Sequence, residues 1–149
     1  MEVIERILVP VDFSEDSERA VALALRVADE ERSSLLLLHV VEKQVYASDL
    51  SLTLPAEPVE DRVAERAGHA LEDFCKRLVP DGYRWTSRVV IGRPAAMISD
   101  TAAAEKSELI VIGTMGLTGV RHLLLGSTAE RVVRTAPCPV LTVRRPAAD

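Results

Sequence analysis

Short runs of apolar residues alternate along the chain with longer segments of helical periodicity. Each apolar run is a strand candidate, because four to eight apolar residues between turn signals are typical of strands buried on both faces. These runs lie at residues 7–11, 34–41, 84–91, 108–113 and 137–143. Between them, apolar spacings of three and four predict helices at about 14–32, 59–78, 94–106 and 127–135.

Local signals support the helix boundaries. Ser and Asp at residues 14–17 can accept hydrogen bonds from the free amides of a first turn, and Pro94 suits a first helical position. Residues 34–41 could form a helix by propensity, but the run is short and ends in two valines. The pattern dissolves at 42–58, and a loop of that length is usually functional or mobile.

Strands that alternate with helices indicate right-handed crossovers and a parallel sheet, and therefore an α/β protein. The 149 residues are enough for one domain with a proper core, so we expect a single domain over 1–149. The composition, 48% hydrophobic and 28% charged, is that of a soluble globular protein. No apolar run approaches the roughly 20 residues that span a bilayer. The acidic start is unlike a secretory signal, so the expected location is the cytoplasm.

Charge and cysteine content exclude further classes. The formal net charge of −5 argues against nucleic-acid binding, which needs clustered Lys and Arg. Cys75 and Cys138 form no CxxC pair, and the three histidines have no metal-ligand spacing. We therefore expect two idle thiols, no metal centre in the protein and no membrane partner.

A glycine-containing segment after the fourth predicted strand carries the candidate chemistry. Gly113 and Gly116 allow sharp turns and a close approach to a ligand, while Gly126, Ser127 and Thr128 open a helix whose amides and dipole favour phosphate. The alternative is that the glycines only make turns and Ser127 only caps its helix. Neither GxxxxGK[ST] nor GxGxxG occurs, so the sequence is not that of a P-loop ATPase.

The spacing of Gly113, Gly116, Gly126 and Ser127 resembles the nucleotide-binding signature of the universal stress proteins, in their UspA-like, ATP-binding form. The resemblance extends to residues 7–14, 38–41, 92–94 and 137–144, and so covers almost the whole chain. It implies an open five-stranded parallel sheet in the order 3-2-1-4-5 with helices on both faces. This is a Rossmann-like fold of the adenine nucleotide alpha hydrolase-like kind, with ATP bound at the carboxyl edge of strands one and four.

The same resemblance implies a role for individual residues. The adenine and ribose end of the ligand would be lined by Pro10, Val11 and Asp12. Backbone groups of Val40 would face the adenine edge, with Ile112 and Gly113 beside the ribose. The phosphates would be wrapped by Gly116, Gly126, Ser127 and Thr128. The expected ligand is therefore ATP, or ADP or AMP, and Mg²⁺ could accompany the phosphates.

Met115 departs from the family pattern, because many members carry His or Arg just before the second glycine. One phosphate cation is thereby lost, which predicts weaker or less triphosphate-selective binding. Arg121 and His122 could partly compensate.

Three further positions have competing interpretations. Asp12 could merely cap a turn, but Ser14 can do that, so we favour a ligand contact for Asp12. His39 lies within an apolar run and is expected to be a hydrogen-bonded core residue rather than a catalytic base. Glu130 and Arg131 are expected on a solvated helix face.

The function favoured by these features is a nucleotide-dependent stress-response or signalling module, since no catalytic set is evident. In this hypothesis, binding shifts a dimer or segment 42–58, and an unidentified protein partner senses that state. A slow ATPase or phosphotransferase using Ser127 or Thr128 is the second hypothesis, and a nucleotide-free interaction protein is the third. The apolar last strand, Val140–Val143, predicts a homodimer paired edge to edge, as the family resemblance also implies.

Overall fold

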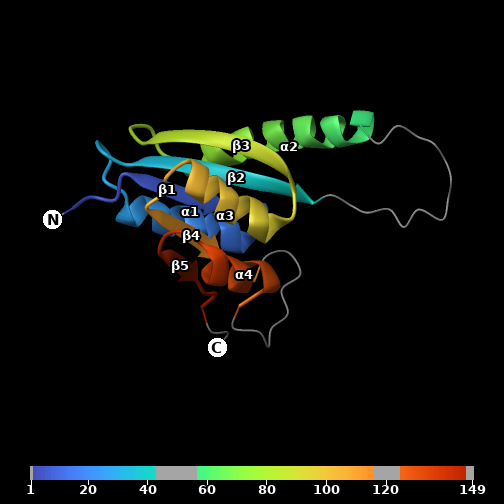
Figure 1. Ribbon diagram of the computed structural model, residues 1–149. Coiled ribbons are helices and arrows are strands. Elements are labelled where there is room, and N and C mark those ends of the chain that lie inside the picture. The colour runs from blue at the N-terminus through green and yellow to red at the C-terminus, as the bar shows by residue number, and fades with distance from the viewer. Residues whose placement is uncertain (1, 43–56, 116–124, 147–149) are drawn as a thin grey trace.

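In the computed structural model, residues 2–42, 57–115 and 125–146 are described, with the side chains of 57 and 58 excepted. Strands and helices alternate strictly along these residues (Figure 1). Their bounds are β1 (Arg6–Pro10), α1 (Glu15–Val27), β2 (Ser34–Glu42), α2 (Glu57–Leu78), β3 (Arg84–Gly92), α3 (Pro94–Ala104), β4 (Leu109–Gly113), α4 (Ser127–Thr135) and β5 (Val140–Val143).

All five strands join one parallel sheet in the order β3-β2-β1-β4-β5, which confirms the predicted fold. Strand β1 lies at the centre, with Ile7 opposite Leu35 of β2 on one side and opposite Leu109 of β4 on the other. The strand order therefore reverses at β1. In open sheets of this kind, the chain leaves such neighbouring strands in opposite directions, and ligands bind in the crevice at their carboxyl ends.

Helices cover both faces of the sheet (Figure 1). Ile7 and Val9 point from β1 into a core beneath α1 and α2, and Leu8 points into a second core beneath α3 and α4. Because successive strand residues face opposite sides and both sides are covered, β1 is apolar at every position after the exposed Arg6. This burial is the reason for the continuous apolar runs in the sequence.

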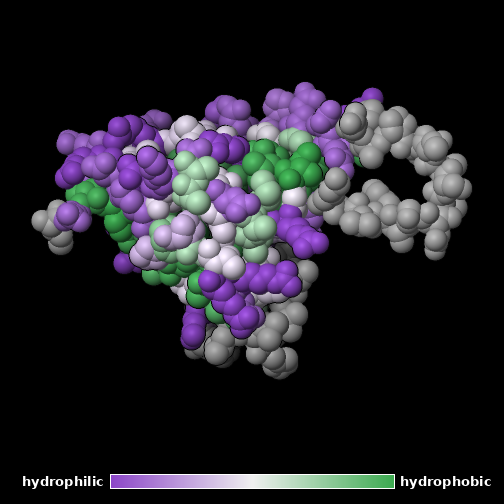
Figure 2. Space-filling model, viewed as in Figure 1, coloured by the Kyte–Doolittle hydropathy of each residue, from purple (hydrophilic) through white to green (hydrophobic). Residues whose placement is uncertain are grey.

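The longest helix of the described part is α2, with 22 residues. Figure 2 shows hydrophilic residues over its outer surface and a hydrophobic patch over the carboxyl end of β3. No helix within residues 2–42, 57–115 and 125–146 is both long and apolar enough to cross a membrane.

Two predicted boundaries were wrong for identifiable reasons. Helix α1 ends at Val27 rather than near residue 32, because the Asp29 side chain accepts hydrogen bonds from the amides of Glu31 and Arg32 and forms a turn. Strand β5 begins at Val140 rather than 137, in keeping with two prolines just before it that lack the amide a strand ladder uses.

Adjacent valines on α4 allow the packing to be tested. Val132 is fully buried in the α3/α4 core, whereas Val133 is 47% exposed. We expect Val132→Ala to lower the free energy of unfolding by about 2 kcal/mol, because two methyl groups are lost and a cavity remains. Val133→Ala should change it by less than about 0.5 kcal/mol. Urea unfolding followed by circular dichroism measures both, and equal losses would contradict this packing.

Candidate functional site

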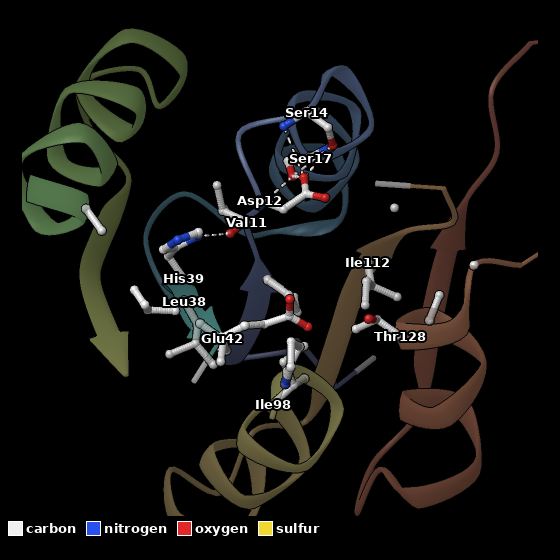
Figure 3. Close-up of a pocket in the computed structure, with 18 of the residues that line it drawn as sticks. Val11, Asp12, Ser14, Ser17, Leu38, His39, Glu42, Ile98, Ile112 and Thr128 are labelled. Carbon is white, nitrogen blue, oxygen red and sulfur yellow. Dashed lines mark hydrogen bonds between the residues drawn. The ribbon is translucent and has the colours of Figure 1, made fainter. Parts of the chain in front are cut away.

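A pocket of about 810 Å³ opens at the carboxyl edge of the sheet, at the ends of the neighbouring strands β1 and β4 (Figure 3). Its wall combines the ends of β1, β2 and β4 with residues from all four helices. Cofactor and small-molecule sites typically occupy about 300–1,000 Å³, so the volume suits a ligand of nucleotide size. Both position and volume are those expected of a binding site in a doubly wound sheet.

The residues predicted for the site converge on this pocket. Gly116 lies outside the described residues, as do segment 43–56, Arg121 and His122. The other predicted residues all line the pocket: Pro10, Val11, Asp12, Val40, Ile112, Gly113, Gly126, Ser127 and Thr128. Residues from three strands and a helix thus share one wall, although their contact with a nucleotide stays a prediction.

The turn between β1 and α1 shapes one side of the pocket. Asp12 accepts a hydrogen bond from the amide of Ser14 at 3.0 Å, and its own amide donates to the Ser17 hydroxyl at 2.8 Å. Ser14 caps α1 by accepting from the amide of Ser17. Ser14 can cap the helix, as the sequence indicated, but Asp12 also holds the turn (Figure 3), so the turn role weighed for Asp12 is present and its ligand contact stays a prediction. Between them Phe13 has a φ of 65°, a conformation that is uncommon outside glycine.

His39 supports the same turn from β2. Its Nδ1 lies 2.7 Å from the carbonyl oxygen of Val11 (Figure 3), and its ring centroid lies 4.6 Å from that of Phe13. The expectation of a hydrogen-bonded histidine is confirmed, but the side chain is half-buried and lines the pocket instead of lying fully in the core. Its hydrogen bond fixes the carbonyl of Val11, a predicted ligand neighbour.

Two glycines permit close packing at the pocket wall. A Cβ on Gly113 would lie 2.8 Å from the Cβ of Asp16, so glycine lets the start of α1 lie directly against the end of β4. A Cβ on Gly126 would lie 2.8 Å from the carbonyl oxygen of Thr114, which accepts a hydrogen bond from the Gly126 amide. Close packing is therefore a role of both glycines that was not predicted from the sequence. The alternative of a cap by Ser127 was wrong, because Gly126 is the N-cap of α4 and Ser127 is its first helical residue.

The first turn of α4 forms part of the pocket wall. Gly126 precedes it in an extended conformation, and no side chain among the described residues caps the helix. Thr128 faces the cavity beside Ile112 (Figure 3), while the exposed Ser127 is at the rim. Amides at a helix start, with two adjacent hydroxyls, can hold an anion without a cationic side chain.

Sequence reasoning missed several lining residues. Helix α2 contributes Val59, Glu60, Val63 and Ala67, and Ile98 comes from α3. Val59 and Val63 are 54% and 45% exposed, and no sequence signal linked this helix face to the glycine segment much further along the chain. Asp16 could have been found, since it stands in the helix turn that follows β1.

Acidic residues dominate the charge of the described wall. It carries Asp12, Asp16, Glu42 and Glu60, and no Lys or Arg occurs among the lining residues within the described ranges. Carboxylates repel phosphate, and each added phosphate charge increases that repulsion. The described wall therefore suits a ligand of low negative charge, or one whose phosphates carry a divalent cation.

The cysteines take no part in the site. Cys75 lies on the buried face of α2, and burial raises the pKa of its thiol to about 11. Burial also raises the pKa of Cys138. Both thiols are thus held protonated and unreactive near neutral pH. In the described segments no cluster of three or more His, Cys, Asp or Glu side chains could hold a metal ion.

Fold and site together define an α/β protein of the doubly wound class with a nucleotide-sized pocket at its switch point. The model of the universal stress protein family matches residues 4–144. Universal stress protein MJ0531 of Methanocaldococcus jannaschii is 34% identical over 95% of this chain and 83% of its own. The chain therefore belongs to the universal stress protein family.

Solved structures show the same fold. Hypothetical protein MJ0577 superposes with a TM-score of 0.85 and 28% identity, covering 99% of this chain and 100% of its own. A universal stress protein in complex with cAMP has a TM-score of 0.65 at 24% identity, covering 95% and 98% of the two chains. An Arabidopsis thaliana family member with AMP bound has a TM-score of 0.63 at 22% identity, covering 96% and 93%. Adenine nucleotides thus bind to some members of the family.

Gly113 and Gly68 form a matched pair for testing the close packing at the pocket. We expect Gly113→Ala to lower the free energy of unfolding by about 1–3 kcal/mol, since the new methyl group must displace α1. Gly68 lies within α2, and nothing lies within 4 Å of the position that a Cβ would take there. Gly68→Ala should therefore raise the free energy of unfolding by about 0.5–1 kcal/mol. Thermal unfolding measures both, and a neutral Gly113→Ala would contradict the packing.

Proposed function

We propose that this protein binds an adenine nucleotide in the pocket at the carboxyl ends of β1 and β4 and acts as a nucleotide-dependent signalling module of the stress response. The observation that carries the proposal is the convergence of the predicted nucleotide residues on one pocket of about 810 Å³. Family members solved with cAMP and AMP support it. The cytoplasmic location stays a prediction from the sequence.

The pocket residues fit the parts of a nucleotide. The half-buried Val40 lines the pocket together with the buried Leu38 and Ile98, so the wall at the carboxyl half of β2 is apolar, which suits an adenine ring. Asp12 lies two residues after the end of β1 and lines the pocket. Its carboxylate is suited to accept hydrogen bonds from the hydroxyls of a ribose. Gly126 and the first turn of α4 supply amides and hydroxyls for phosphate. The phosphate end would thus be held through neutral donors, with Mg²⁺ entering only with the phosphates.

The charge of the wall bears on which nucleotide binds best. With four carboxylates and no cationic side chain on the described wall, ATP gains less from its extra phosphates than in a site with a lysine or arginine. The family resemblance implies that Met115 stands where many members carry His or Arg. We therefore propose that AMP and ADP compete effectively with ATP, and that Mg²⁺ strengthens ATP binding more than AMP binding.

Thr128→Val tests the assignment of the phosphate end. The substitution keeps the side-chain shape and removes the hydroxyl that faces the pocket. Loss of a hydrogen bond to a charged phosphate is worth about 1.5 kcal/mol, so the dissociation constant for AMP should rise about tenfold. Isothermal titration with nucleotide-stripped protein measures this change.

The matched control is Thr86→Val, on β3 and away from this pocket, which should leave AMP affinity unchanged. Absence of binding by the unaltered protein to any adenine nucleotide at millimolar concentration would overturn the proposed function. Equal affinities of the Thr128 variant and the unaltered protein would overturn only the phosphate assignment.

We also propose that two copies pair through β5. This strand is one edge of the sheet, and its residues are half-buried because Leu141 and Val143 pack on the α1/α2 core and Val140 on the other. These side chains already pack against the two cores, so the edge offers mainly its backbone N–H and C=O groups to a second strand. Pairing across a two-fold axis would satisfy those groups.

The two edge strands allow a controlled test of this dimer. A lysine placed on an edge strand opposes strand pairing. Thr142→Lys on β5 should therefore convert the dimer to monomer, while Thr86→Lys on the opposite edge, β3, should leave it intact. Sedimentation equilibrium measures the mass. A monomeric unaltered protein, or dissociation by the β3 variant alone, would contradict pairing through β5.

A further inference from the structure

Asp16 is a buried carboxylate at the pocket wall that the proposed ligand contacts do not use. Its side chain is only 1% exposed, although it stands in the first turn of α1. Its Oδ1 accepts a hydrogen bond from Nη1 of Arg19 at 3.0 Å and from Nε of Arg145 at 3.0 Å. Its Oδ2 accepts from the amide of Met115 at 3.2 Å. Both oxygens are therefore engaged by groups from three separate parts of the chain.

These contacts join the phosphate end of the site to the edge of the sheet. Met115 follows β4 at the point where the chain enters the glycine segment, and Arg145 follows β5. The amide of the preceding residue, Thr114, donates to the carbonyl oxygen of Val143 at 3.2 Å. The amides of two consecutive residues after β4 are thus held by Asp16 and by the last residue of β5.

The same contacts balance the negative charge of Asp16. A carboxylate that is nearly excluded from water is costly unless it is paired, and here two guanidinium groups pair with it. The hydrogen bond to Asp16 raises the pKa of Arg145 further, so this arginine stays charged. Asp16 lines the pocket, and the positive charges of the two arginines offset its negative charge. They therefore reduce the repulsion that a bound phosphate would meet there.

We propose that Arg145 acts through Asp16 as a positioning and charge-balancing residue for the phosphate end of the site, and that it couples nucleotide binding to the end of β5. This inference rests on the proposed function. Arg145 does not line the pocket and is 42% exposed on its side chain, so its effect on the ligand is transmitted by Asp16 and the Met115 amide. By thermodynamic linkage, a ligand that binds better when the Met115 amide is bonded to Asp16 also strengthens the hydrogen bond between Arg145 and Asp16.

Arg145→Ala provides the first test, because Arg19 still pairs with Asp16 and the exposed position tolerates truncation. Affinities for adenosine, AMP and ATP are measured by isothermal titration at low salt. We expect adenosine to bind as in the unaltered protein, AMP on the order of fivefold more weakly, and ATP more weakly still. The loss should shrink at high salt, since it has an electrostatic part.

Two control variants separate this role from others. Arg134→Ala removes the same charge from the last turn of α4, where Arg134 pairs with Glu130 and does not contact Asp16. It should change none of the three affinities. Arg145→Lys keeps the charge and should restore most of the AMP affinity. An equal loss for adenosine and AMP, or an equal loss in the Arg134 variant, would overturn the proposed role of Arg145.

Hydrogen exchange of the Met115 amide tests the coupling without any ligand. We expect this amide to exchange several-fold faster in Arg145→Ala than in the unaltered protein or in Arg134→Ala. Unchanged exchange would overturn the positioning role, whatever the titrations show. Faster exchange in a protein that binds no nucleotide would support the Arg145–Asp16–Met115 link and overturn only the proposed function.

Discussion

Parallel pairing of β1 with both β2 and β4 is the constraint on which the rest of the structure depends. Because β1 is central, the chain must leave it toward one side, build β2 and β3, and cross back to build β4 and β5 on the other. The connections that follow β1 and β4 then diverge and leave a crevice between them. The pocket lies in this crevice, and its wall is therefore a consequence of strand order rather than of any single loop.

Close approach of α1 to β4 decides which side chains line the crevice. Gly113 has no side chain to separate the two elements, so Asp16 and the turn at Asp12 lie directly beside the start of the glycine segment. Asp12 both holds that turn and lines the pocket. The same side chain therefore supports the turn and takes part in the candidate binding site.

The strands were predicted well from the sequence where both of their faces are buried. Strands β1, β2 and β4 are largely apolar runs because helices cover both faces, and the strand order followed from the family resemblance. Predictions failed where side chains act on backbone, as at Asp29, whose carboxylate ends α1 early. The α2 face of the pocket was also missed, because Val59 and Val63 look like ordinary helix residues until the fold places them along the pocket wall.

What the sequence determined by itself is the alternation of strands and helices and the set of glycines and hydroxyls suited to phosphate, because periodicity and backbone freedom are local properties. Tertiary structure alone decided how these residues meet. Met115 and Arg145 lie 99 and 129 positions after Asp16, yet both share hydrogen bonds with it at the pocket wall. Such a pairing has no local signature, since it arises only when α1 packs across the ends of β4 and β5.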